Sequence, residues 1–125
     1  MVLGIGTDLI EIDRIERSIE RFGDRFLHKI FTPAEIDFCR RKKAAAESFA
    51  VRFAAKEAAA KALGTGIARG IGWKDIEVRR SPGQAPTLHW HGRAAELAHV
   101  RGIRRVSVSL THSRQMAMAF VVAEG

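Results

Sequence analysis

Apolar positions at the start of the chain first alternate and then recur in a helical rhythm. Over Val2–Ile12 apolar residues alternate with small or polar ones, which predicts a strand that bends at Gly4 and Gly6. Apolar residues next recur every three or four positions, as on the buried face of a helix. We expect this helix to be capped by Asp13 and to end near Gly23.

The middle of the chain predicts two more helices. Residues 26–31 are expected to form a connector, and Thr32-Pro33-Ala34-Glu35 then has the sequence of a capping box with proline in the first turn. A long helix is expected over about Ala45–Leu63, because its second half, from Arg52, is rich in alanine and has no proline or β-branched residue. Gly64 suits the residue that follows its last turn.

The C-terminal half predicts a hairpin, a short helix and two strands. Residues 76–78 and 87–90 alternate on either side of a Pro-Gly turn, which indicates a β-hairpin. Gly92 to about Arg101 is expected to be helical. Val106–Leu110 and Met116–Ala123 follow as strands, the second of which has on one face Met118, Phe120 and Val122.

Composition and charge limit the classes of function. The chain has 125 residues, with 21 Lys and Arg against 14 Asp and Glu, and a net charge of +7. Such a charge favours an acidic partner or an anionic ligand, so nucleic acid, an acidic protein and a phosphorylated metabolite all stay open. Cys39 is the only cysteine, so an intrachain disulfide is excluded. No apolar run reaches the length of a membrane span, and we expect a cytoplasmic protein of one domain, residues 1–125.

The long helix carries the most prominent candidate chemistry. At 100° per residue, Phe53, Glu57 and Lys61 lie on one stripe, beside alanines that are expected to be buried. The pair of charges is either a solvated ion pair that adds little to helix stability or a metal and phosphate site. Gly64-Thr65-Gly66 would then lie close to the same ligand.

Three other features allow a structural and a functional interpretation. Asp8 stands in an apolar strand, where a carboxylate caps a turn, faces solvent or binds a ligand. His112 follows a strand beside two hydroxyls and an arginine, where it belongs either to a capped turn or to a ligand site. The first helix has an arginine face that is either solvated or docks an acidic helix or phosphates, formed by Arg14, Arg17 and Arg21 and followed by Arg25.

Three separated blocks resemble one family. They are Gly4-Ile5-Gly6-Thr7-Asp8-Leu9-Ile10-Glu11-Ile12-Asp13-Arg14-Ile15, then Arg52-Phe53-Ala54-Ala55-Lys56-Glu57-Ala58-Ala59-Ala60-Lys61-Ala62-Leu63-Gly64-Thr65-Gly66, and lastly Ser109-Leu110-Thr111-His112-Ser113 with Ala117-Met118-Ala119-Phe120-Val121-Val122. Together they resemble the holo-[acyl-carrier-protein] synthases, which are small 4′-phosphopantetheinyl transferases. The middle block is the most specific, and the resemblance covers nearly the whole chain.

The resemblance implies a reaction in fatty acid biosynthesis. Phosphopantetheine passes from coenzyme A to a serine of apo acyl carrier protein, and adenosine 3′,5′-bisphosphate leaves. The family uses Mg²⁺, and Asp8 and Glu57 match its metal ligands, which suits a hard cation that prefers oxygen. Lys61 matches the motif lysine, so the implied catalytic residues are Asp8, Glu57 and Lys61. Either Glu57 or a metal-bound water would accept the serine proton.

The resemblance also assigns binding residues. Arg52, Lys61, Gly64, Thr65 and Gly66 would face coenzyme A phosphates, and His112 matches a histidine expected near the coenzyme. Pro86 stands near the expected adenine pocket, although the family often has Gly-x-Pro there and this chain has Gln84-Ala85-Pro86. The acidic carrier protein would dock on the first helix through Arg14, Arg17, Arg21 and Arg25.

An α+β fold and a homotrimer with active sites between subunits are further implications of the resemblance.

Two other classes of function stay open from the residues alone. One is a basic module that binds RNA or an acidic protein, although no aromatic residue is interleaved with the arginines of the first helix. The other is a phosphate-binding enzyme of a different reaction class.

Overall fold

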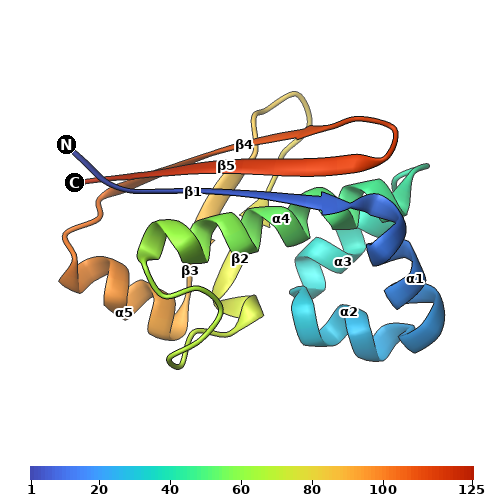
Figure 1. Cartoon of the computed structure of the whole chain (residues 1–125), viewed down its shortest axis with the longest axis horizontal. Helices are drawn as coiled ribbons and strands as arrows, with labels where there is room; N and C mark the ends of the chain where they lie inside the picture. The colour runs from blue at the N-terminus through green and yellow to red at the C-terminus, as the bar shows by residue number, and fades with distance from the viewer.

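A three-stranded antiparallel sheet lies over one long helix in the computed structural model, which describes residues 1–125 (Figure 1). The strand order is β1–β5–β4, with β1 at Val2–Glu11, β5 at Met116–Glu124 and β4 at Arg105–His112. The long helix α4, Ala45–Leu63, packs against β1 and β5. The predicted α+β fold, long helix and C-terminal strands are therefore confirmed.

The other elements pack along α4: three helices lie at its N-terminal end, the hairpin crosses its middle, and α5, Gly92–Val100, lies towards its C-terminal end (Figure 1). The three helices are α1 at Ile12–Phe22, α2 at Asp24–Ile30 and α3 at Pro33–Arg40. The hairpin of β2 (Ile76–Arg79) and β3 (Thr87–Trp90) follows the 3₁₀ turn η1 at Trp73–Asp75. The predicted hairpin and the short helix after it are confirmed, as is the capping box of Thr32 and Glu35 at the start of α3.

Two expectations for the N-terminal helices are wrong. Residues 26–31 belong mostly to α2, because Leu27 and Ile30 bury one side of a helical turn. Asp13 does not cap α1: the cap is Glu11, without a side-chain hydrogen bond, and Asp13 forms an ion pair of 2.8 Å with Arg17. The end of α1 at Gly23, which has a φ of 58°, is confirmed.

A very close contact joins β1 to α4. A Cβ atom at Gly4 would lie 2.0 Å from the carbonyl oxygen of Ala62, and one at Gly6 would lie 1.8 Å from that of Ala58. Only glycine therefore allows the strand to reach the helix backbone at these two positions. The bend expected at the glycines corresponds to a register shift between Val2 and Gly4.

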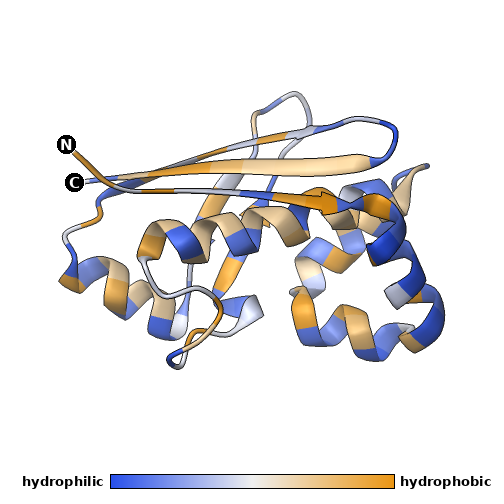
Figure 2. Cartoon of the chain, viewed as in Figure 1, coloured by the Kyte–Doolittle hydropathy of each residue, from blue (hydrophilic) through white to orange (hydrophobic).

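The contact between α4 and the sheet forms the centre of the core. On the helix side the contact uses small residues, of which Ala54, Ala55, Ala58 and Ala59 have no exposed surface. Figure 2 shows apolar colours along α4 and β5, whereas α1 is mostly hydrophilic. Small side chains on both partners keep the sheet close to the helix axis, so side chains at the edge of β1 come within reach of those on α4.

A buried ion pair joins α4 to α3. Lys56 Nζ lies 2.7 Å from Glu35 Oε1, and neither side chain is exposed to solvent. Lys56 also donates to the carbonyl of Trp73, and Glu35 accepts from the backbone of Val78. Burial lowers the pKa of Lys56, against the opposing effect of Glu35. No pattern in the sequence predicted this role of Lys56.

No helix has the combination of length and hydropathy that crossing a bilayer requires.

The contact at Gly6 yields a stability prediction. Gly6→Ala is expected to lower the free energy of unfolding by about 1–3 kcal/mol, because the added methyl group has to displace the α4 backbone. Urea unfolding measures this change. Gly72→Ala is the matched control, since a Cβ there makes an ordinary contact of 3.7 Å, and a change within about 0.5 kcal/mol is expected. Equal effects of both substitutions would contradict the account.

Candidate functional site

Two carboxylates and a lysine meet where β1 passes over α4. Asp8 comes from the β1 face that is turned to the helix, between Gly6 and Ile10. Lys61 Nζ lies 3.4 Å from Asp8 Oδ1 and donates to the carbonyl of Thr7 at 3.0 Å. Glu57 lies one helical turn before Lys61. The structure thus brings the three expected catalytic residues together.

This group of residues is more open than the sequence analysis expected. The stripe with Glu57 and Lys61 is only partly covered, and the Lys61 side chain is 52% exposed, whereas that of Asp8 is 19% exposed. The fully buried flank of α4 is the one that carries Lys56. Burial of the surrounding alanines comes from the sheet, which covers the helix only up to the edge of β1. The site is therefore accessible from solvent along that edge.

The surroundings of Glu57 at this site shift its pKa. Its pKa is raised, mainly because the carboxylate is partly buried and next because the charge of Asp8 is close. Lys61 and Arg14 act in the opposite direction, more weakly. A carboxylate whose pKa is raised by a neighbouring negative charge marks a place where a cation is favourable.

The donor set fits Mg²⁺ that is shared with a substrate. Asp8 and Glu57 supply carboxylate oxygens, and no group of three or more His, Cys, Asp or Glu side chains is arranged to hold a metal ion. Mg²⁺ commonly takes one or two carboxylates and completes its shell with water and substrate phosphates. A site closed by three or four protein ligands, as for structural zinc, is not formed here.

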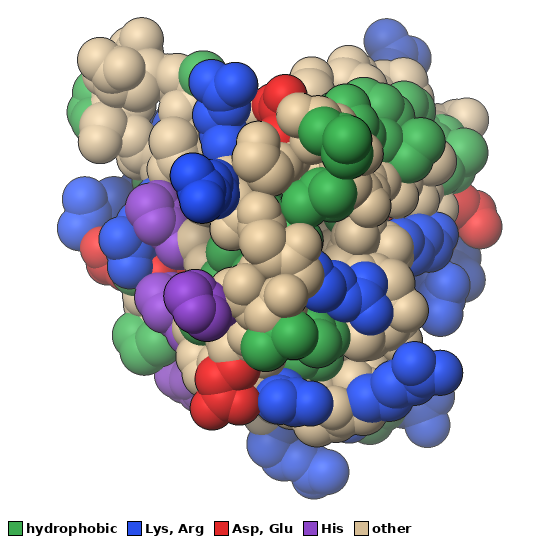
Figure 3. Space-filling model, turned by 90° about the vertical axis from the view of Figure 1, so that its left-hand side faces the viewer, with side chains coloured by type: hydrophobic (Ala, Val, Ile, Leu, Met, Phe, Trp, Pro, Cys, Tyr) green, Lys and Arg blue, Asp and Glu red, His purple; other side chains and the backbone are tan.

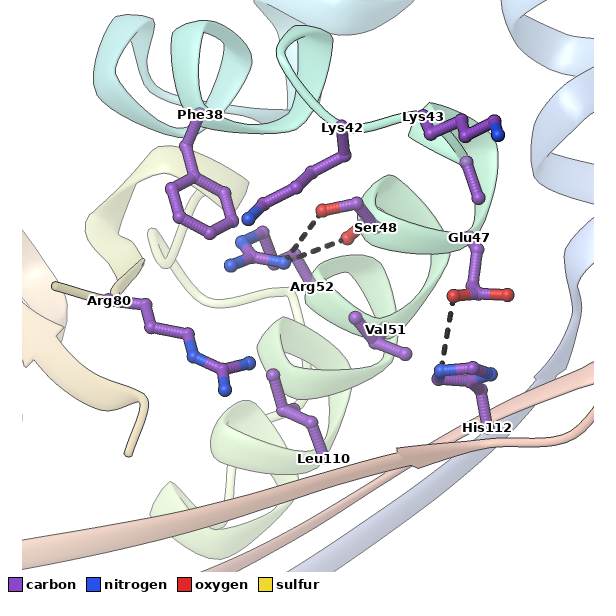
Figure 4. Close-up of a pocket in the computed structure, with 11 residues that line it drawn as sticks. Phe38, Lys42, Lys43, Glu47, Ser48, Val51, Arg52, Arg80, Leu110 and His112 are labelled. Carbon is purple, nitrogen blue, oxygen red and sulfur yellow. Dashed lines mark hydrogen bonds and ion pairs between the residues drawn. The ribbon is translucent and has the colours of Figure 1, made fainter. Parts of the chain in front are cut away.

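A second site lies on the other side of α4 (Figure 4). It is a cavity of about 410 Å³ between the start of α4, the end of α3 and the end of β4, lined by Phe38, Lys42, Lys43, Ala44, Glu47, Ser48, Val51, Arg52, Arg80, Leu110 and His112. His112 Nε2 lies 3.1 Å from Glu47 Oε1. The excess of basic side chains makes this cavity suitable for an anion.

Arg52 is built firmly into this cavity. The residue is 3% exposed, donates to the hydroxyl and the carbonyl of Ser48, and has its guanidinium 4.3 Å from the centre of the Phe38 ring. Its Nε is buried without a hydrogen-bond partner. A buried guanidinium with a free donor is costly unless a ligand supplies an acceptor.

The structure keeps these two groups of expected site residues apart within one chain. Nine residues separate Arg52 from Lys61, which at 100° per residue places them on opposite sides of α4. Asp8, Glu57 and Lys61 therefore face the β1 edge, whereas Arg52 and His112 face the cavity. One ligand bound to a single chain does not reach both sets by a direct path.

The remaining expected coenzyme contacts are less well formed. The backbone N–H groups of Gly64, Thr65 and Gly66 all donate to the carbonyl of Ala60, so they cap α4 and do not form a nest of free donors. Gly64 has the left-handed conformation expected of it, with φ at 90°. Pro86 precedes β3 and lies outside the residues that line the cavity.

The arginines expected to dock a carrier protein are exposed. Arg14, Arg17 and Arg21 line one shallow groove along α1, of about 330 Å³. Arg17 is paired with Asp13, and the Arg21 guanidinium lies over the ring of Phe22. Arg25 belongs to α2 and lines an adjoining hollow. The four arginines thus lie on two consecutive helices, α1 and α2.

Sequence analysis missed four charged residues of the cavity. Lys42 and Lys43 were visible only as a basic run at the end of a helix, and Glu47 and Arg80 carried no pattern of their own. They come together because α3, α4 and the hairpin converge, which no local pattern shows. Arg80 extends into the cavity from the end of β2 (Figure 4).

The coupling of the two carboxylates yields a prediction on Glu57. Asp8→Asn is expected to lower the pKa of Glu57, because it removes a neighbouring negative charge, and Lys61→Met is expected to raise it further. NMR titration of the ¹³C-labelled Glu57 carboxyl group measures both. Metal affinity should fall as the pH drops through the raised pKa, since a protonated carboxyl group binds Mg²⁺ poorly. An unchanged Glu57 pKa in Asp8→Asn would show that the carboxylates do not share a site.

Comparisons with known proteins agree with this geometry. The sequence model of the 4′-phosphopantetheinyl transferase superfamily matches residues 4–120. A holo-[acyl-carrier-protein] synthase of Koribacter versatilis is 54% identical, over 99% of this chain and 99% of its own length.

Solved structures show the same fold. The crystal structure of the holo-[acyl-carrier-protein] synthase from Neisseria meningitidis superposes with a TM-score of 0.90 at 37% identity, over 100% of both chains. That of the Helicobacter pylori enzyme in complex with coenzyme A superposes with a TM-score of 0.84 at 36% identity, over 96% of this chain and 99% of that one. The chain therefore belongs to the 4′-phosphopantetheinyl transferase superfamily, within its holo-[acyl-carrier-protein] synthase family.

Proposed function

We propose that this protein transfers 4′-phosphopantetheine from coenzyme A to a serine of apo acyl carrier protein. The meeting of Asp8, Glu57 and Lys61 at an open edge carries this proposal, because it joins a cation site to a phosphate-binding lysine. The family and the coenzyme A complex of a relative support the same reaction. The serine oxygen forms a bond to the β-phosphorus of coenzyme A, and the bond to adenosine 3′,5′-bisphosphate breaks.

Asp8 and Glu57 are the residues that would hold Mg²⁺. When bound, the ion would neutralise the charge that builds on the diphosphate during transfer. The chain's own contribution is to hold both carboxylates close together at one edge. The Lys61 ammonium, held at the Thr7 carbonyl, adds a second positive charge beside the phosphates. The serine proton goes to Glu57 or to a water molecule beside it.

Intact mass spectrometry of apo acyl carrier protein tests the reaction. Incubation with the protein, coenzyme A and Mg²⁺ should add one phosphopantetheine group to the carrier, and a chelator should prevent the addition. Glu57→Gln should reduce the rate about 100- to 1000-fold without loss of fold, as judged by circular dichroism. A folded protein that leaves several apo carriers unmodified would contradict the proposal.

We propose that the carrier docks on the arginine groove of α1. The groove is exposed and basic, and the charge of Arg14 at its start weakly opposes the rise in the pKa of Glu57, so the docking surface adjoins the reaction site. A carrier bound there would have its serine close to Glu57. Charge complementarity between a basic helix and an acidic carrier accelerates association and weakens with salt.

Arg21→Glu is the sharper test of docking, because Arg14 also acts on Glu57. We expect KM for the carrier to rise about tenfold with little change in kcat, since a like charge then opposes an acidic partner. Arg93→Glu, an exposed position on α5, is the matched control. An unchanged KM in Arg21→Glu, or an equal rise in both variants, would reject this docking surface.

We propose that the protein is a homotrimer. The outer face of the sheet is largely apolar on β1 and β5: Leu9 pairs with Met118 and Thr7 with Phe120, and Ile5 and Leu9 are 60% and 61% exposed. A contiguous apolar face of this kind favours coverage by protein. Other copies of the chain would cover this face. The carboxylate site and the Arg52 cavity of one chain face opposite sides of α4, so the two sets of residues would meet only across the boundary between neighbouring chains.

Subunit mixing tests the shared site. Glu57→Gln and Arg52→Ala should each be inactive alone, yet a mixture exchanged into mixed trimers should recover about a quarter of the wild-type sites. Sedimentation should give three times the chain mass of 13.8 kDa, and Phe120→Glu should reduce it. An inactive mixture of exchanged subunits would show that each chain completes its own site.

We propose that the enzyme acts in fatty acid biosynthesis in the cytoplasm. The proposal follows from the reaction, which supplies the carrier on which acyl chains are built. Depletion of the protein in its host should lead to accumulation of the apo form of the fatty-acid carrier in the cytosolic fraction. If the fatty-acid carrier stays in its holo form after depletion, this role in fatty acid biosynthesis would be rejected.

A further inference from the structure

A second basic groove lies between the hairpin and the three-stranded sheet. Its volume is about 460 Å³, and it runs between β3 and the start of β4. Leu88, Trp90, Ile103 and Val106 supply its apolar lining. Strand β3 pairs only with β2, and β4 pairs only with β5, so neither strand has a ladder partner across the groove.

The basic side chains that line this groove outnumber the acidic side chains that pair with them. Its basic lining consists of three arginines and two histidines, Arg79, Arg104, Arg105, His89 and His91, without an acidic residue. Figure 3 shows histidine side chains gathered among Lys and Arg side chains on the end of the molecule where this groove lies.

Acidic partners account for only part of this charge. Arg79 Nε lies 2.9 Å from Glu77 Oε1, and His91 Nε2 lies 3.0 Å from the same oxygen. Arg105 Nε is 3.5 Å from Glu124, and its side chain is 74% exposed. The Arg104 guanidinium forms no ion pair or hydrogen bond with the protein.

The surroundings of His89 also contain more basic than acidic side chains. Its ring contacts the hydroxyl of Thr87 at 2.9 Å and has no carboxylate partner of its own. Its pKa is lowered, first by burial and then by Arg79 and His91, with Glu77 acting in the opposite direction. Cations that repel one another around a cavity are stabilised by a bound anion.

The chemistry of the lining selects the class of anion. Guanidinium groups bind phosphate with two parallel hydrogen bonds, and Trp90 offers an aromatic surface beside them. The volume lies in the range of sites for small molecules. We propose that this groove is a second ligand site, distinct from the transferase site, which binds a small organic phosphate with its phosphoryl group at Arg104 and a flat apolar group on Trp90.

The groove is separate from the cavity of Arg52. Arg79, the last residue of β2, lines the groove, whereas Arg80, which follows the strand, lines the cavity. Arg105 and His112 stand at opposite ends of β4. A ligand in the groove therefore leaves the proposed coenzyme pocket free.

NMR of protein with ¹⁵N-labelled histidine tests the site, since each pocket has its own reporter. His89 and His91 report on the groove, and His112 reports on the Arg52 cavity, so the result does not depend on transferase activity. The probes are inorganic phosphate, adenosine 5′-monophosphate and adenosine, with sodium chloride at matched ionic strength. We expect both phosphates to move the His89 and His91 signals with saturation, the monophosphate with a Kd at least about threefold lower than that of inorganic phosphate.

Arg104→Ala provides the decisive variant. It should raise the Kd of adenosine 5′-monophosphate about tenfold, because a charged hydrogen-bond donor is lost, and leave carrier modification unchanged. Arg93→Ala is the matched control and should leave the Kd unchanged. Three results would each overturn the proposal: no movement of His89 or His91, movement equal to that with chloride, or a Kd that Arg104→Ala does not alter. Movement of His112 alone would also overturn it.

Discussion

The approach of β1 to α4 is the constraint on which the rest of the structure depends. Gly4 and Gly6 bring the strand onto the backbone of the helix, with no room for a Cβ atom against the carbonyls of Ala62 and Ala58. At that separation Asp8 reaches the stripe of Glu57 and Lys61. A looser contact would leave the two carboxylates solvated and further apart, so the same two glycines that pack the core also bring together the carboxylates of the proposed cation site.

Charge inside the protein is arranged in two different ways. The Lys56–Glu35 pair is fully buried and satisfied by further hydrogen bonds, and it fixes α3 and the hairpin against α4. The removal of one partner from such a pair costs several kcal/mol, because the other charge is left uncompensated. Arg52, by contrast, is buried with an unpartnered Nε at the wall of a cavity. The first arrangement stabilises the fold, and the second leaves binding capacity for an anion.

Local sequence patterns predicted most of the helices and strands. They also placed Glu57 and Lys61 on one stripe of α4. Alanine content predicted α4, and the capping box at Thr32 predicted α3, because these signals act within a few residues. The missed helix α2 lacks a side-chain cap and begins directly after Gly23. The environments of Lys56 and Arg80 were not predictable, since they depend on elements that are distant in sequence and meet only in the fold. The family resemblance supplied what periodicity could not, namely the pairing of Asp8 with Glu57, and the structure places these two carboxylates near each other.

The location of a bound metal ion is the measurement that tests this account most directly. Mn²⁺ prefers the same oxygen ligands as Mg²⁺ and gives an anomalous signal in crystals of the protein grown with coenzyme A. The account predicts one peak per chain within about 2.2 Å of a carboxylate oxygen of Asp8 and of one of Glu57, beside a phosphate of the coenzyme. A peak that lies on other residues, or a bound coenzyme with no peak between these two carboxylates, would contradict it.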